Sequence, residues 1–346
     1  MIAALPSRGS GRSLLAIGVL VLAALALLPV VGLAVFAWMG PATASLELGP
    51  TGQEQMVNTV LLVLSVGVLG AALGTANGWL TANCHFPGSR WLRIAQLLPL
   101  ATPAYLLAAT LIDLGSRNSW RIHGLLWAIT VLTLTTYPYV FLLSTESFAV
   151  SGSRQLEASR SLGVGPWGSF RRVALPMALP AIGAGVALSG MEVVNELGAV
   201  ELLGVPTLSS GILQRWQNDG DPQGAVALAL VALVIVSLLV AAERQLRRRS
   251  RRWLMGSGGD RQAPWALSGW RAAIAQLLTL LPPVATLGLP LLWAGLSLDQ
   301  LQSEPPEELL TLGSRSLGLG LLAAALTVAV GLVLAIAKRW IPQPLL

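Results

Sequence analysis

The chain has 346 residues, of which 54% are hydrophobic and only 11% are charged, and its formal net charge is +6. This composition excludes an ordinary soluble domain and is typical of a polytopic, all-α membrane protein. The single cysteine excludes an internal disulfide framework, and two histidines leave no metal site by ligand count. The basic residues lie beside apolar runs, which indicates membrane orientation rather than nucleic-acid binding.

The apolar runs predict eight membrane-spanning helices. The first follows Arg8 and Arg12 and is too long for a signal-peptide core, although residues 42–44 resemble a cleavage site. Pro99 and Pro103 interrupt the third, so we expect it to face protein or a cavity rather than lipid. The spans are expected at residues 14–38, 57–80, 94–111, 125–143, 176–197, 225–242, 272–296 and 317–337.

The basic residues test this map, because loops on the cytoplasmic side carry an excess of Lys and Arg. With the N-terminus inside, 18 of the 22 basic residues fall in inner segments. Only Arg117, Arg121, Arg215 and Arg315 fall outside. We therefore expect a cytoplasmic N-terminus and a cytoplasmic loop at residues 151–176. The cluster at residues 247–252 is expected to anchor on anionic lipid.

That loop belongs to the polar stretch LEASRSLGVGPWGSFRRVALPMALP, residues 156–180. The glycine and proline residues of this stretch predict two short helices. Gly163 suits the left-handed position after the first, and Pro166 suits the first turn of the second. Trp167, Phe170 and Val173 then form an apolar stripe that needs a partner.

The spacing of Glu157-Ala158-Ser159, Gly163 and Val173-Ala174-Leu175-Pro176 resembles the signature loop of permease subunits of binding-protein-dependent ABC importers. Ser159 and Val173 are the departures from the family pattern. The resemblance implies a type I ABC importer permease (MetI-like) with a core of six transmembrane helices. Residues 98–105, 136–140, 195–200 and 204–212 are similar to the ferric-iron branch of that family.

The resemblance implies that the loop couples the spans to a separate ATPase subunit, present in two copies. The chain has no GxxxxGK[ST] loop, so we expect no cofactor of its own and no enzymatic activity. The residues expected to form the coupling loop are Glu157, Ala158, Ser159, Gly163, Trp167, Phe170, Leu175 and Pro176. An alternative is that Trp167 and Phe170 lie against the lipid interface or the chain's own helix ends.

The expected partners also include an extracytoplasmic or periplasmic substrate-binding protein and membrane lipid, at the inner (plasma) membrane. Candidates for the translocation path are Glu192, Asn195 and Glu196, because intramembrane carboxylates usually face a pathway or a partner. The alternative is that both carboxylates lie in water at the outer interface. Ferric iron is the expected cargo, with thiamine, sulfate or polyamine as alternatives. A secondary transporter is a distant alternative that leaves the coupling loop unexplained.

An internal repeat is also visible, because Leu-Leu-Pro occurs at residues 27–29 and again at 280–282 in a similar context. We expect residues 1–252 to form a first permease core and residues 253–346 to begin a second copy with two spans. No second signature loop follows before Leu346. We therefore expect a truncated or split chain: either it is a fragment of a longer permease, or its missing half comes from another polypeptide.

Overall fold

The computed structural model describes residues 8–39, 48–150, 159, 161–254, 265–297 and 306–340. The chain forms two units, Thr43–Leu296 and the pair Met1–Ala42 with Ser297–Leu346. The described part of the second unit consists of α1 (Arg8–Met39) and α15 (Pro306–Trp340). Most of their apolar side chains are exposed, as expected of helices surrounded by lipid or by partner helices.

The Thr43–Leu296 unit holds the remaining elements. Its described helices, with the 3₁₀ and π turns among them, are α2 (Gly49–Asn83), α3 (Ser89–Ala95), Leu98–Ala101 (3₁₀), α4 (Ala104–Arg117), α5 (Leu125–Val150), α7 (Pro166–Ser169), Phe170–Ala174 (π), α8 (Leu175–Asn195), α9 (Gly198–Leu202), α10 (Leu208–Gln217), α11 (Pro222–Leu254), α12 (Trp270–Pro283), Val284–Gly288 (π) and α13 (Leu289–Leu296). Two short strands, β1 (Cys84–His85) and β2 (Trp265–Ala266), pair in parallel.

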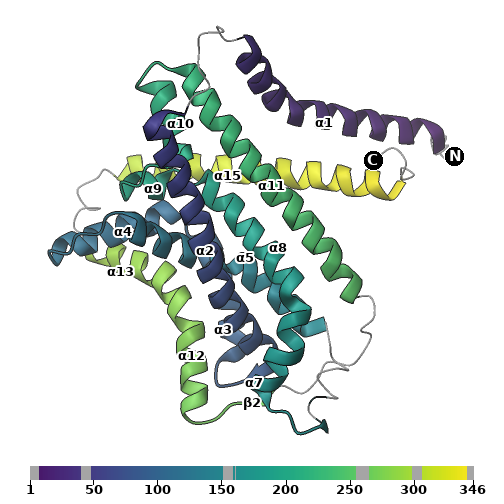
Figure 1. The fold of residues 1–346 in the computed structure, drawn as a ribbon, viewed down its shortest axis with the longest axis vertical. Helices are drawn as coiled ribbons and strands as arrows, with labels where there is room; N and C mark the ends of the chain where they lie inside the picture. Colours follow the sequence, from purple (N-terminus) through teal and green to yellow (C-terminus); the bar gives the residue numbers. More distant parts are fainter. Residues whose placement is uncertain are drawn as a thin grey trace. The chain divides into compact units, whose positions relative to one another are not determined.

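The centre of this unit is a bundle in which α2, α5 and α8 lie side by side, with α11 against α8 (Figure 1). Small residues let these helices approach closely. A Cβ at Gly185 would lie 2.6 Å from the Cα of Val140, and one at Gly74 would lie 2.8 Å from the backbone nitrogen of Phe141. Close approach through small residues is the usual way in which helices associate in a bilayer.

Seven described helices are long and apolar enough to span a membrane, and an eighth span results if one bent pair is counted. That pair is Ser89–Ala101 with Ala104–Arg117, and the two parts meet at 90°. Thr102 is extended between them, as the residue before a proline tends to be. The sequence predicted an interrupted third span, and the structure has two separate helices there instead of one kinked helix.

Two π turns have the same sequence relation to a proline. Phe170–Ala174 precedes Leu175-Pro176, and Val284–Gly288 precedes Leu289-Pro290. Proline has no N–H to donate and its ring clashes with the carbonyl four residues earlier, so a widened turn relieves both problems. The expected fifth span therefore begins earlier than Pro176, and one continuous helix runs from Pro166 to Asn195.

Segments predicted to lie on the same side of the membrane meet in the structure. At one end, β1 pairs with β2, and Trp79 packs against both Trp265 and Phe170. At the other end, Trp293 donates from its indole nitrogen to Asp113 (2.9 Å), and Gly124 donates to the carbonyl of Leu203 (2.8 Å). The alternation of loops derived from the basic residues thus agrees with the packing. The division of the chain at residue 252 stays a prediction.

Candidate functional site

The predicted coupling loop is partly described. Glu157 and Ala158 lie outside the described residues. Ser159 is buried, and its Oγ lies 2.7 Å from the Oγ of Ser169. Gly163 has a φ of +75°, and α7 begins at Pro166, so both expectations for these residues are confirmed. The serine pair ties the two sides of the turn together.

The two aromatic residues of the loop have different surroundings. Phe170 is partly buried, with ring centroids 5.2 Å from Trp79 and 6.1 Å from Phe148. Trp167 is 69% exposed and touches Phe170 at a centroid distance of 5.5 Å. Phe170 therefore packs against the chain's own helix ends, which is the alternative raised from the sequence, whereas Trp167 presents a free face to a partner or to lipid.

Trp79, Phe148 and Trp265 form an aromatic cluster that packs against Phe170 of the predicted coupling segment (residues 151–176), and sequence reasoning missed this cluster. Trp79 is buried, and its ring centroid lies 5.5 Å from that of Phe148 and 5.5 Å from that of Trp265. The sequence did offer an indication of this cluster, because large aromatic residues at the predicted inner ends of separate spans commonly gather at the membrane interface. Leu175 and Pro176 form the first turn of α8, directly after the π turn; Leu175 is partly buried and Pro176 is exposed.

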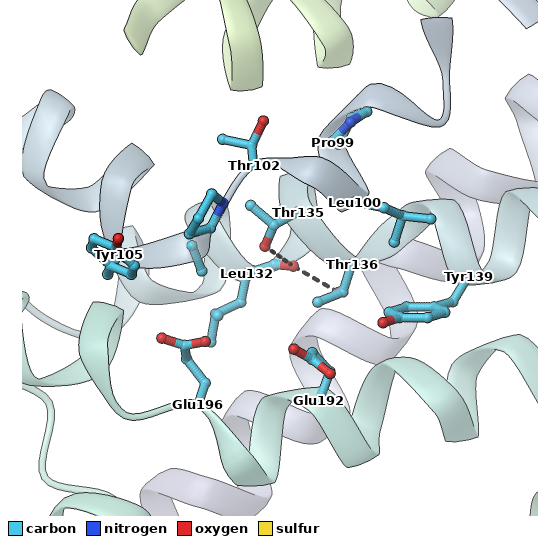
Figure 2. Close-up of a pocket in the computed structure, with 12 residues that line it drawn as sticks. Pro99, Leu100, Thr102, Tyr105, Leu132, Thr135, Thr136, Tyr139, Glu192 and Glu196 are labelled. Atoms are coloured by element: carbon cyan, nitrogen blue, oxygen red, sulfur yellow. Dashed lines mark hydrogen bonds between the residues drawn. The ribbon is translucent and has the colours of Figure 1, made fainter. Parts of the chain in front are cut away.

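A cavity of about 220 Å³ lies near the other end of α8, beside the break of the third span. Figure 2 shows Glu192 and Glu196 projecting from the end of α8 toward residues of α5, with Tyr139 next to Glu192. The break supplies the opposite wall. The cavity is lined by Pro99, Leu100, Thr102, Pro103, Ala104, Tyr105, Leu132, Thr135, Thr136, Tyr139, Glu192 and Glu196.

The three path candidates do not all reach this cavity. Glu192 lies on the last turns of α8 and is exposed. Glu196 follows the last residue of α8, has an extended backbone, and its Oε1 accepts from the backbone N–H of Ala199 (2.8 Å). Asn195 donates back to the carbonyl of Met191 (2.9 Å) and is not among the residues lining the cavity. The structure thus brings the two carboxylates together and leaves the amide out.

Glu196 also has a structural task. Its carboxylate caps the start of α9, where free N–H groups favour negative charge, and its carbonyl accepts from the hydroxyl of Ser209 (2.6 Å). Glu192 forms no hydrogen bond or ion pair recorded among the described residues. The two carboxylates are therefore not equivalent, and Glu192 is the one free to interact with a solute.

Sequence reasoning did not identify the other polar residues that line the cavity as part of a translocation path. Tyr105 of α4 and Thr135, Thr136 and Tyr139 of α5 contribute hydroxyl groups, and nothing in the local sequence around them indicates a cavity. Pro99 and Pro103, whose span was expected to face protein or a cavity, do line it. Across the described residues, no group of three or more His, Cys, Asp and Glu side chains could hold a metal ion.

Comparisons with known proteins identify relatives of this chain. The chain is 29% identical over 221 residues to a ferric-iron transport system permease protein of Haemophilus influenzae, a match covering 63% of this chain and 43% of that protein. It is 28% identical over 215 residues to a sulfate transport system permease protein of Escherichia coli, covering 57% of this chain and 77% of the relative. The chain thus spans less than half the length of the ferric-iron permease.

Among solved structures, a bacterial ABC transporter involved in the import of the acidic polysaccharide alginate has a TM-score of 0.54 at 14% identity. That match covers 69% of this chain and 96% of the transporter chain, and it supports the fold alone. Residues 74–252, more than half of the chain, match the family described as the binding-protein-dependent transport system inner membrane component. The chain therefore belongs to this family of ABC importer permeases.

Proposed function

We propose that this chain is the membrane-spanning permease of an ATP-driven importer of ferric iron. Iron would arrive on an extracytoplasmic binding protein and pass through the cavity beside the broken third span. Energy would come from two separate ATPase subunits, one docking on the predicted cytoplasmic loop at residues 151–176 and the other on a second permease half. The observation that carries the cargo assignment is the pair of carboxylates, Glu192 and Glu196, in one cavity.

The charge of this lining favours a cation. Two carboxylates near each other repel an oxyanion such as sulfate and attract a cation. All polar side chains lining the cavity present oxygen atoms, which suit hard metal ions. A cation is therefore a better fit than the sulfate carried by the E. coli relative.

The small number of carboxylates suits transport. A pathway must attract an ion enough for entry and hold it weakly enough for release. Two carboxylates, one of them already engaged with the N–H of Ala199, provide attraction without a closed coordination shell. The cavity is thus suited to brief contact with cargo.

The broken span explains how polar backbone is tolerated here. Irregular backbone at membrane depth occurs where it lines a cavity or is buried in protein. The chain between Ala101 and Ala104 meets that condition, because Thr102 and Pro103 both line the cavity.

Transport by reconstituted vesicles tests the proposal. Vesicles would contain this chain, its cognate ATPase, any second permease half and a ferric-binding protein, and uptake of ferric iron, sulfate and thiamine would be compared with and without ATP. We expect ATP-dependent uptake of iron alone. Uptake of sulfate or thiamine in place of iron would refute the cargo while preserving the transporter class, and uptake driven by an ion gradient without ATP would refute the class.

A matched pair of variants tests the cavity. Glu192→Gln keeps the shape of the side chain and removes its charge, so iron uptake should fall by about tenfold or more, as expected for losing a charged contact worth about 1.5–3 kcal/mol. Asn195→Ala changes a neighbouring residue outside the cavity and should leave uptake unchanged. Equal effects of the two variants would contradict a path through this cavity.

A further inference from the structure

An apolar slot lies at the predicted cytoplasmic end of the helical core, beside the coupling segment. Its volume is about 610 Å³, and its walls come from α2, from the segment between Pro166 and Ile182, and from α12. Apart from Thr75 and Cys84 the lining is carbon-rich: Ala71, Ala72, Ala76, Trp79, Leu80, Pro166, Trp167, Phe170, Leu175, Leu179, Ile182, Leu267 and Leu278. A slot of this chemistry has too few polar partners to hold ordered water.

A second cavity, of about 510 Å³, adjoins the slot and shares Leu80, Pro166, Trp167 and Leu267 with it. This one is lined in addition by Trp270 and Arg271. The Cζ of Arg271 lies 5.6 Å from the centre of the Trp270 ring, and none of the ion pairs between described residues includes Arg271. The guanidinium group of Arg271, beside the Trp270 ring, thus lies in the cavity that adjoins the apolar slot.

We propose that the slot and its neighbour together bind one anionic phospholipid, with an acyl chain in the slot and the headgroup phosphate at Arg271. Basic pockets between membrane helices on the cytoplasmic side are suited to anionic headgroups, and Trp rings favour the level of the headgroups. The apolar lining and the single cation match the two halves of such a lipid.

The depth of the slot favours lipid over a soluble protein. Along α2 the lining runs from Ala71 to Leu80, about 13 Å at the rise of an α-helix. A docked ATPase could cover the exposed face of Trp167, but it would reach this depth only by inserting an apolar segment into the bilayer. An acyl chain already lies at that depth.

The site also adjoins the coupling segment. Pro166, Trp167 and Phe170 line the slot, so a bound acyl chain would brace α7 from the membrane side. This consequence rests on the proposed role of the segment at residues 151–176, whereas lipid binding itself does not.

Native mass spectrometry of the purified full chain tests the binding. The protein would be presented with phosphatidylglycerol and phosphatidylcholine of the same acyl chains in equal amounts. We expect one phosphatidylglycerol per chain, retained about fivefold over phosphatidylcholine, as one basic contact near the membrane surface implies. Arg271→Gln should abolish that preference, and Ala72→Phe, which fills the slot from an exposed helix position, should lower retention of both lipids.

Arg90→Gln is the matched control. It removes one positive charge from an exposed residue of α3 that lines neither cavity, so it should keep the wild-type preference. The proposal is overturned if Arg271→Gln keeps the preference, if Arg90→Gln loses it equally, or if Ala72→Phe retains lipid as well as wild type. Arg271 is exposed, so its variant should fold, and the thermal unfolding of each variant checks this.

Discussion

Replacing Gln96 should destabilise the helical core more than any other single polar change there. Gln96 is fully buried just before the break of the third span. Its Oε1 accepts from Asn77 Nδ2 (2.8 Å) and from the hydroxyl of Tyr137 (3.0 Å), and its Nε2 donates to the carbonyl of Thr279. One side chain thus links α3 and the break to α2, α5 and α12.

The variant Gln96→Met keeps the length of the side chain and removes all three hydrogen bonds. A hydrogen bond between membrane helices contributes about 0.6 kcal/mol on average, and a buried polar group left without a partner costs about 1–3 kcal/mol. Asn77, Tyr137 and Thr279 would each lose a partner, so we expect a loss of about 2–4 kcal/mol in free energy of unfolding. With the relation between unfolding free energy and Tm that holds for soluble domains, this loss of stability lowers Tm by about 5–15 °C.

The single cysteine provides the assay. Cys84 is buried, so a fluorogenic thiol reagent reports its exposure as the purified protein is heated in detergent. Ser189→Ala is the control, because it removes one buried hydrogen bond, from the Ser189 hydroxyl to Thr136 Oγ1 (2.7 Å), and should lower Tm by about 1–4 °C. A Gln96→Met transition no lower than that of Ser189→Ala would refute the idea that the three bonds act together.

Three further outcomes follow from local geometry. Gly185→Ala should lower the free energy of unfolding by about 1–3 kcal/mol, because its new Cβ would clash with the backbone of α5. Gly183→Ala should lower it less, because a Cβ there meets only the movable end of a leucine side chain. Thermal unfolding of the two variants compares these effects. Gly163→Val should reduce cargo moved per ATP while Gly163→Asn retains it, because φ of +75° disfavours β-branched residues; equal coupling in the two would contradict this. Burial raises the pKa of the Cys84 thiol to about 11, so alkylation should rise about tenfold per pH unit up to about pH 10, and a plateau near pH 9 would contradict it.

Hydropathy and the positions of glycine and proline were enough to predict the number of spans and the turn at Gly163 and Pro166, because both depend on local chemistry. Glu192 and Glu196 were both candidates for the translocation path, and both line one cavity. Glu196, however, lies beyond the end of the helix expected at residues 176–197, since α8 ends at Asn195 and Glu196 caps α9. Helix periodicity carries no information about where tertiary contacts end a helix.

The remaining features depend on contacts between segments far apart in sequence. The 90° break could be placed at Pro99 and Pro103, but its angle is set by what packs on either side. Nothing in the local sequence around Gln96 indicates partners on three other helices. The same holds for Trp265, which packs against Trp79 from a different part of the chain.

The continuity of the helix from Pro166 to Asn195 suggests how the two candidate regions work together. The sequence favoured a division between the coupling loop and the fifth span, which would have allowed the loop to move alone. Instead, Trp167 and Glu192 stand on one helix, about 37 Å apart at 1.5 Å per residue. A displacement of α7 by a docked ATPase would then tilt the helix end that carries Glu192, unless the helix yields at its π turn, the point where Pro176 has already weakened the hydrogen bonding. The cavity and the predicted coupling segment are therefore linked by one helix, in which the π turn is the place where we expect bending.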